Sequence, residues 1–134
     1  MTGGGVHSMK AATFCPDSYF VNARARDLVG DDERAVRRLL ELIAETNRST
    51  LASLHQSFEA GRWGELASAA HRMAGSARML GHDELLAVLS DLEAAARTQD
   101  RERATAHMPL IAEALARLGK SIEEALKDST GAGQ

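Results

Sequence analysis

Apolar side chains recur at every third or fourth position through most of this chain, and this spacing restricts the fold more than any other feature. Such a spacing places apolar side chains along one face of an α-helix. No segment alternates apolar and polar residues, so the sequence predicts helices and no strands. The clearest apolar positions are Val36, Leu39, Leu40, Ile43, Leu51, Leu54 and Phe58, and later Met108, Ile111, Leu115, Leu118, Ile122 and Leu126.

Residues that favour helix ends divide this pattern into separate helices. A short helix has Pro16 in its first turn and ends at Gly30, since proline suits a helix start and glycine a left-handed end. Asp31 and Asp32 are suited to cap the start of the next helix. The following helices are expected over residues 32–60, 63–80 and 83–98, with Gly61 and Gly81 as stops.

Pro109 leaves two options for the last helix. Either the helix begins near Pro109, or it begins near Asp100 and is kinked at Pro109, where a carbonyl loses its hydrogen-bond partner. We favour the second option.

These elements predict an all-α fold, an antiparallel up-and-down four-helix bundle with a short extra N-terminal helix. A chain of 134 residues is long enough for one such domain. We expect the bundle to cover residues 14–128, with flexible tails at 1–13 and 129–134.

Composition excludes several classes of protein. A net charge of −3 and a pI of about 5.9 argue against a nucleic-acid-binding protein. The single cysteine, Cys15, excludes an internal disulfide and a cysteine-based zinc site, which suggests a reducing, cytoplasmic location. No apolar stretch approaches the roughly 20 residues that span a membrane, so we expect no direct membrane contact. We also expect a monomer.

The run from His71 to Gly81 contains the most informative residues. With Leu66 at zero on a helical wheel, His71 lies at about 140°, away from the core face. The wheel places Ala67, Ala74, Gly75 and Arg78 around it. The expected core face of this helix consists of Leu66, Ala69, Ala70, Met73, Ala77 and Leu80.

Gly75 lies one turn after this exposed histidine. Its presence there calls for an explanation, because glycine inside a helix lowers helix stability by about 1 kcal/mol relative to alanine. Gly75 either clears space for a partner that approaches His71 or lets a neighbouring helix pack closely. The wheel alone leaves both interpretations open.

Histidine is itself a nucleophile, because a neutral imidazole has one ring nitrogen with a free lone pair. Phosphoryl transfer needs positioning and charge neutralisation more than covalent machinery. An open, convex histidine suits transfer from a protein donor, whereas a small-molecule enzyme needs a concave pocket.

At these residues the sequence resembles a known family, the histidine-containing phosphotransfer (HPt) domain. The resemblance rests on Ala70-His71-x-x-x-Gly75-Ser76-Ala77-x-x-Leu80-Gly81, followed by Leu85, Leu86, Leu92 and Glu93, and extends from Tyr19 to Leu126 with Trp63 before the motif. It favours the first interpretation of Gly75.

The resemblance implies a four-helix bundle that accepts a phosphoryl group on an exposed histidine. The donor is the aspartate of a response-regulator receiver domain, and another receiver takes the group on. His71 is then the phosphorylation site, through its outward ring nitrogen. The receiver supplies Mg²⁺, so the resemblance implies no bound cofactor or metal in this chain.

One residue departs from the family pattern. The family usually carries lysine three residues after the histidine, where it helps to hold the phosphate, and this chain has Ala74 there. We predict that Arg78, two turns from His71 on nearly the same face, supplies the missing charge. Arg72 is a less well-placed candidate.

Two other functions stay open. The loss of the usual lysine at Ala74 also fits a non-phosphorylated adaptor that binds receivers. Alternatively, the apolar seam of the last helix binds a second copy of the chain.

The remaining histidines, His7, His55, His82 and His107, look incidental. A di-metal site in a bundle needs Glu-x-x-His repeats, and none occurs here. The sequence fits either a stand-alone protein or the C-terminal module of a hybrid sensor kinase, and we favour the module.

Overall fold

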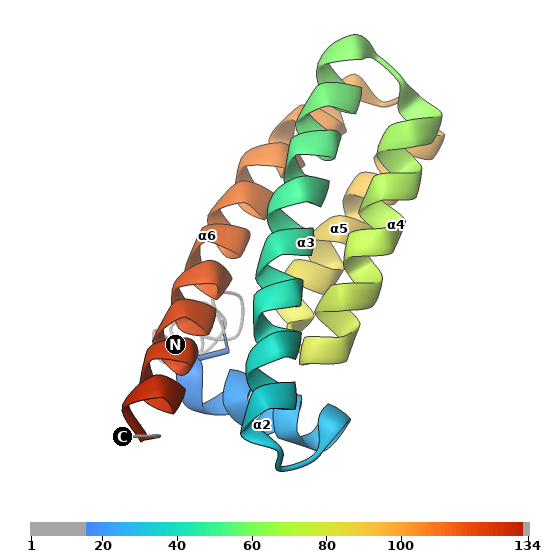
Figure 1. Cartoon of the computed structure of the whole chain (residues 1–134). Coiled ribbons are helices and arrows are strands. Elements are labelled where there is room, and N and C mark those ends of the chain that lie inside the picture. The colour runs from blue at the N-terminus through green and yellow to red at the C-terminus, as the bar shows by residue number, and fades with distance from the viewer. Residues whose placement is uncertain (1–15, 133–134) are drawn as a thin grey trace, which may run out of the picture.

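Five helices account for nearly all of residues 16–132, the part of the chain that the computed structural model describes (Figure 1). They are α2 (Ser18–Val29), α3 (Glu33–Ala60), α4 (Trp63–Leu80), α5 (Asp83–Arg97) and α6 (Arg101–Ala132). The four long helices run alternately up and down, and α2 lies across one end of the bundle. The described residues contain no strand, so the predicted all-α bundle with an extra N-terminal helix is confirmed.

The helix ends follow local sequence chemistry. Gly61 and Gly81 end α3 and α4 with φ of 69° and 71°, a left-handed backbone that favours glycine. Asp32 caps α3, as predicted, because its carboxylate accepts a hydrogen bond from the next helical turn. Pro16 precedes α2 instead of lying in its first turn, because Asp17 occupies the N-cap.

The last helix passes through Pro109 without a break. The Asp100 side chain accepts a hydrogen bond from the Arg103 amide at 3.1 Å and caps the helix start. A helix that begins near Asp100 is therefore confirmed over one that begins at Pro109. The helix continues to Ala132, into the segment expected to be a tail, whereas the tail expected at 1–13 lies outside the described residues.

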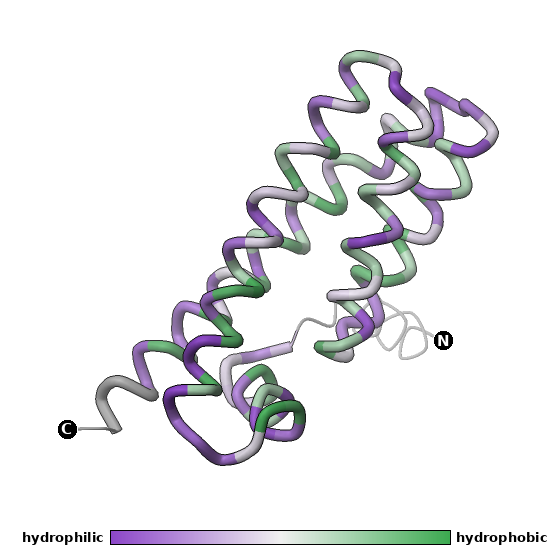
Figure 2. Tube along the Cα trace, turned by 45° about the vertical axis from the view of Figure 1, so that its right-hand side comes forward, coloured by the Kyte–Doolittle hydropathy of each residue, from purple (hydrophilic) through white to green (hydrophobic). Residues whose placement is uncertain are grey.

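The core lies between the four long helices, whose apolar stretches face inward (Figure 2). Five of the six seam residues of α6 are buried there, including Ile111 at 0% and Ile122 at 1% exposure. Leu126 is partly buried against the same core. The seam that one alternative assigned to a second copy of the chain thus packs into the chain's own core.

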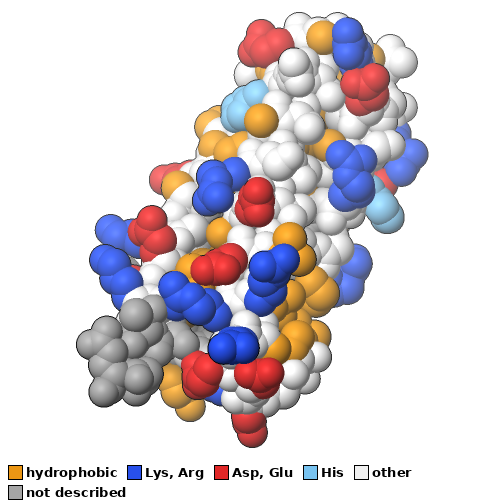
Figure 3. Space-filling view, viewed as in Figure 1, with side chains coloured by type: hydrophobic (Ala, Val, Ile, Leu, Met, Phe, Trp, Pro, Cys, Tyr) orange, Lys and Arg blue, Asp and Glu red, His pale blue; other side chains and the backbone are white. Residues whose placement is uncertain are grey.

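Within the described residues, no helix combines the length and the apolar character needed to cross a membrane. Lys and Arg side chains alternate with Asp and Glu over the face that Figure 3 shows, without forming a continuous basic patch.

Candidate functional site

The imidazole of His71 projects into solvent from the middle of α4. Its side chain is 73% exposed, while its neighbour Ala70 is fully buried and Met73 is 2% exposed. The prediction that His71 lies on the outer face of its helix is therefore confirmed.

Glu93 holds the imidazole from the neighbouring helix α5. Its Oε1 lies 3.3 Å from His71 Nδ1, and its Oε2 accepts a hydrogen bond from Arg97 Nη2 at 2.6 Å. The Glu93 side chain is only 19% exposed, so the carboxylate lies in the seam between the two helices. The guanidinium of Arg97, with a smaller contribution from His71, keeps the pKa of Glu93 below its usual range.

This contact assigns roles to the two ring nitrogens. Because the carboxylate of Glu93 is an acceptor only, a neutral His71 places its proton on Nδ1. Nε2 then carries the free lone pair and points away from Glu93. The sequence motif contained Glu93 but gave it no role. The one signal for it was Arg97 four residues later, the spacing of an ion pair on a helix.

Two residues expected beside His71 on the open surface are buried instead. Ala67 and Ala74 are 4% and 5% exposed, so the prediction that they contribute to the outer face is wrong. The wheel assumed one core direction, whereas α4 packs against both α3 and α5. The arc of buried positions on α4 is wider for that reason.

Gly75 lies on the outer face one turn from His71. A Cβ added there would meet no heavy atom within 4 Å. The interpretation that Gly75 lets a neighbouring helix pack closely is therefore excluded. What Gly75 provides is bare helical backbone beside the imidazole.

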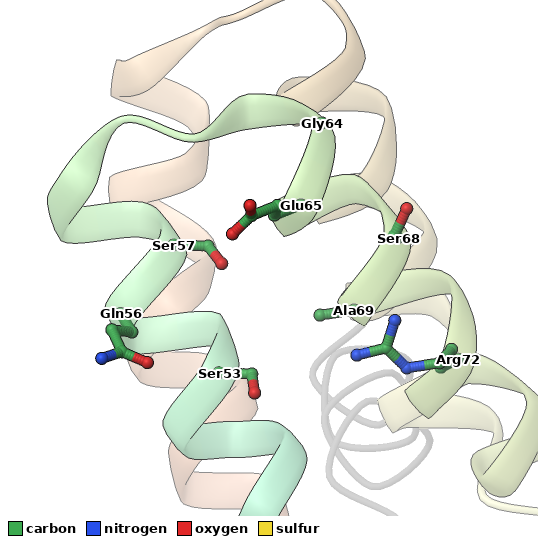
Figure 4. Close-up of a pocket in the computed structure, with 8 residues that line it drawn as sticks. All are labelled: Ser53, Gln56, Ser57, Gly64, Glu65, Ser68, Ala69 and Arg72. Carbon is green, nitrogen blue, oxygen red and sulfur yellow. The ribbon is translucent and has the colours of Figure 1, made fainter.

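The two candidate arginines point to different surroundings. Arg78 is exposed, and its guanidinium has no hydrogen bond or ion pair among the described residues. Arg72 turns the other way, into a cleft between α3 and α4 (Figure 4). Ser76 donates a hydrogen bond to Asn47 of α3 at 3.5 Å and so takes part in the contact between α3 and α4.

Three of the other histidines lie within the described residues, and His7 does not. His55 is exposed. His107 lies near Asp91, with Nε2 and Oδ2 3.4 Å apart. Residues 16–132 contain no group of three His, Cys, Asp or Glu side chains arranged to hold a metal ion.

His82 has a structural role at the start of α5. It is fully buried, and its Nδ1 accepts a hydrogen bond from the Leu85 amide at 3.4 Å at the start of α5. Burial, and secondly the charge of Arg117, lower the pKa of His82 to about 4.

Comparison with known proteins gives one family and three relatives. The family model described as the Hpt domain matches residues 38–128. The virulence sensor protein BvgS of Bordetella pertussis is 32% identical over 72 residues, which is 54% of this chain and 6% of that protein. BvgS of Bordetella parapertussis is 29% identical over 93 residues, 69% of this chain and 7% of that protein. BvgS of Bordetella bronchiseptica matches to the same extent. No solved structure matches the chain.

Proposed function

The chain belongs to the Hpt domain family, whose members act in the phosphorelays of two-component signalling, and on this basis we propose that His71 carries the phosphoryl group. The donor in this proposal is the phosphorylated aspartate of a receiver domain, and a second receiver accepts the group. The chain spans only 6–7% of the length of its curated relatives, so the proposal concerns this domain and not their whole activity.

One observation supports this function above the others. The imidazole of His71 is exposed, its Nδ1 is held by Glu93, and bare backbone at Gly75 lies beside it. This arrangement leaves Nε2 outward and accessible to a partner as large as a protein domain.

The reaction uses the lone pair of Nε2. Nε2 attacks the phosphorus, the bond from phosphorus to the aspartate oxygen breaks, and the carboxylate leaves as an anion. The ring gains positive charge as the N–P bond forms, and the carboxylate of Glu93 faces that charge through Nδ1. The same steps in reverse hand the group to a second receiver.

The receiver supplies the Mg²⁺ in this proposal. The carboxylate that contacts His71 is that of Glu93. Both of its oxygens already have partners, one in His71 and the other in Arg97, so neither is left to bind a metal ion. The role of this chain is to present a fixed nucleophile, while the partner provides the ion that neutralises phosphate charge.

Incubation of the chain with receivers labelled with radioactive phosphate tests the proposal. We expect transfer of label to the chain within minutes, with loss of the label in acid and retention in alkali, as for an N–P bond. Label that survives acid, or no label from any receiver of the source organism, would contradict it.

The adaptor alternative keeps the same partner but not the chemistry. It is favoured by one observation, Ala74 in the position where the family usually carries lysine. An adaptor binds phosphorylated receivers without taking up label, so the same incubation decides between the two functions.

Arg78 is the residue that we expect to replace the missing lysine. Its Cα lies about 10 Å further along the helix than that of His71, and helical side chains lean back toward the N-terminus. We predict that Arg78→Ala lowers the transfer rate or the lifetime of the phosphohistidine by about three- to tenfold. Arg38→Ala, an exposed arginine on α3, is the control. If Arg78→Ala changes neither quantity, the role belongs to another residue.

A further inference from the structure

A polar cleft of about 520 Å³ separates α3 from the N-terminal half of α4 (Figure 4). It lies on the side of α4 that faces α3, whereas His71 lies toward α5. The polar side chains that line it are Ser53, Gln56 and Ser57 of α3 and Glu65, Ser68 and Arg72 of α4.

The cleft presents hydrogen-bonding groups that the protein itself does not use. Ser57 is only 7% exposed, and Figure 4 shows its hydroxyl directed into the cleft. Among residues 16–132 none of the hydroxyls of Ser53, Ser57 and Ser68 has a hydrogen-bond partner. These hydroxyls border the open cleft, so each is free to form a hydrogen bond with a polar group of another molecule.

The two ends of the cleft carry opposite charges. Arg72 extends into it and has no ion pair among the described residues. Glu65 lies two helical turns away, about 10 Å along the axis, and is already 3.7 Å from Arg62. A carboxylate therefore fits at the Arg72 end, beside the guanidinium, and is repelled at the Glu65 end.

The cleft is open and polar, which favours a protein side chain over a small molecule, since small-molecule sites are enclosed and mostly apolar. Around α4, Ser68 at the edge of the cleft and Gly75 fall between Arg72 and His71, and both are small and exposed. A protein that reaches Nε2 of His71 across this strip also reaches the cleft.

We propose that the cleft binds an acidic side chain of the receiver domain that docks on His71, and that Arg72 thereby selects among receivers. This inference rests on the proposed function and adds a specificity site to it. Arg72 acts on docking alone, because its guanidinium is directed away from His71.

The charge reversal Arg72→Glu tests the inference, with Arg38→Glu as a control that makes the same change of net charge at an exposed position on α3. Transfer rates are measured against receiver concentration. We expect Arg72→Glu to raise KM at least about tenfold for the receivers that label the wild type fastest, with kcat within about twofold. Arg38→Glu changes neither quantity. Arg72→Gln, which removes charge without repulsion, gives a smaller increase in KM, and circular dichroism confirms folding.

Labelling by phosphoramidate, a small phosphoryl donor, separates the two claims because it needs no docking. An unchanged KM in Arg72→Glu, or an equal rise in both charge reversals, overturns the cleft inference and leaves the proposed function intact. If phosphoramidate and receivers both leave the wild-type chain unlabelled, the proposed function fails, and this inference with it.

Discussion

Replacement of His71 by glutamine abolishes transfer of label from phosphorylated receivers, to below about 1% of the wild-type rate. The amide nitrogen of glutamine has no available lone pair, so no N–P bond forms. The variant folds normally, because His71 is exposed and glutamine is at least as good a helix former as histidine. Stopped reactions on denaturing gels, with a urea melt of each variant, measure both quantities.

His55→Gln and His107→Gln serve as matched controls, because both histidines lie in helices outside the contact with Glu93. Both are expected to take label at the wild-type rate. Persistent label in His71→Gln would show that another residue accepts the phosphoryl group.

Glu93→Gln keeps an oxygen near Nδ1 but removes the negative charge, so we expect the variant to take up label at about a three- to tenfold lower rate.

Most of the helix boundaries and the exposure of His71 were predictable because they depend on local sequence. A glycine that ends a helix, or an aspartate that caps one, acts on its own backbone and needs no distant contact. The position of His71 on α4 follows from its 100° steps from Leu66. Such features are read from a single helix.

The features that were missed depend on a second helix. Ala67 and Ala74 are buried because α5 packs against their side of α4, and a helical wheel does not show where the second neighbour lies. Glu93 joins His71 from 22 residues away for the same reason. The cleft beside Arg72 exists only where α3 and α4 separate, so its residues have no common motif in the sequence.

The burial of His82, which directly follows Gly81, is another feature that the local sequence does not show. A histidine directly after Gly81 suits a helix start, and His82 is the N-cap of α5, but its complete burial was not visible in the sequence. Burial is the main cause of its lowered pKa, and the charge of Arg117 on α6 adds to the effect from a distant part of the chain. Its Nε2 has no hydrogen-bond partner among the described residues.

This burial makes the stability of the bundle dependent on pH. The pKa of His82 is about 4 in the folded chain and about 6.5 when unfolded, so between these values the unfolded state binds the extra proton. The free energy of unfolding should be highest above pH 6.5 and fall as pH drops toward 4, by up to about 3 kcal/mol. Urea unfolding at pH 7, 6 and 5 measures this change in the free energy of unfolding. These pH values lie above the range in which the carboxylate of Glu93 titrates, since its pKa is lowered.

His82→Asn isolates the contribution of His82. Asparagine still caps the start of α5, but it does not titrate. Because its side chain is smaller than that of histidine, it leaves a cavity, and the free energy of unfolding at pH 7 falls by about 1–3 kcal/mol. Its free energy of unfolding should then change much less between pH 7 and pH 5 than that of the wild type. His55→Asn, at an exposed position, should retain the wild-type slope. An equal slope in His82→Asn and the wild type would show that another group is responsible for the loss of stability.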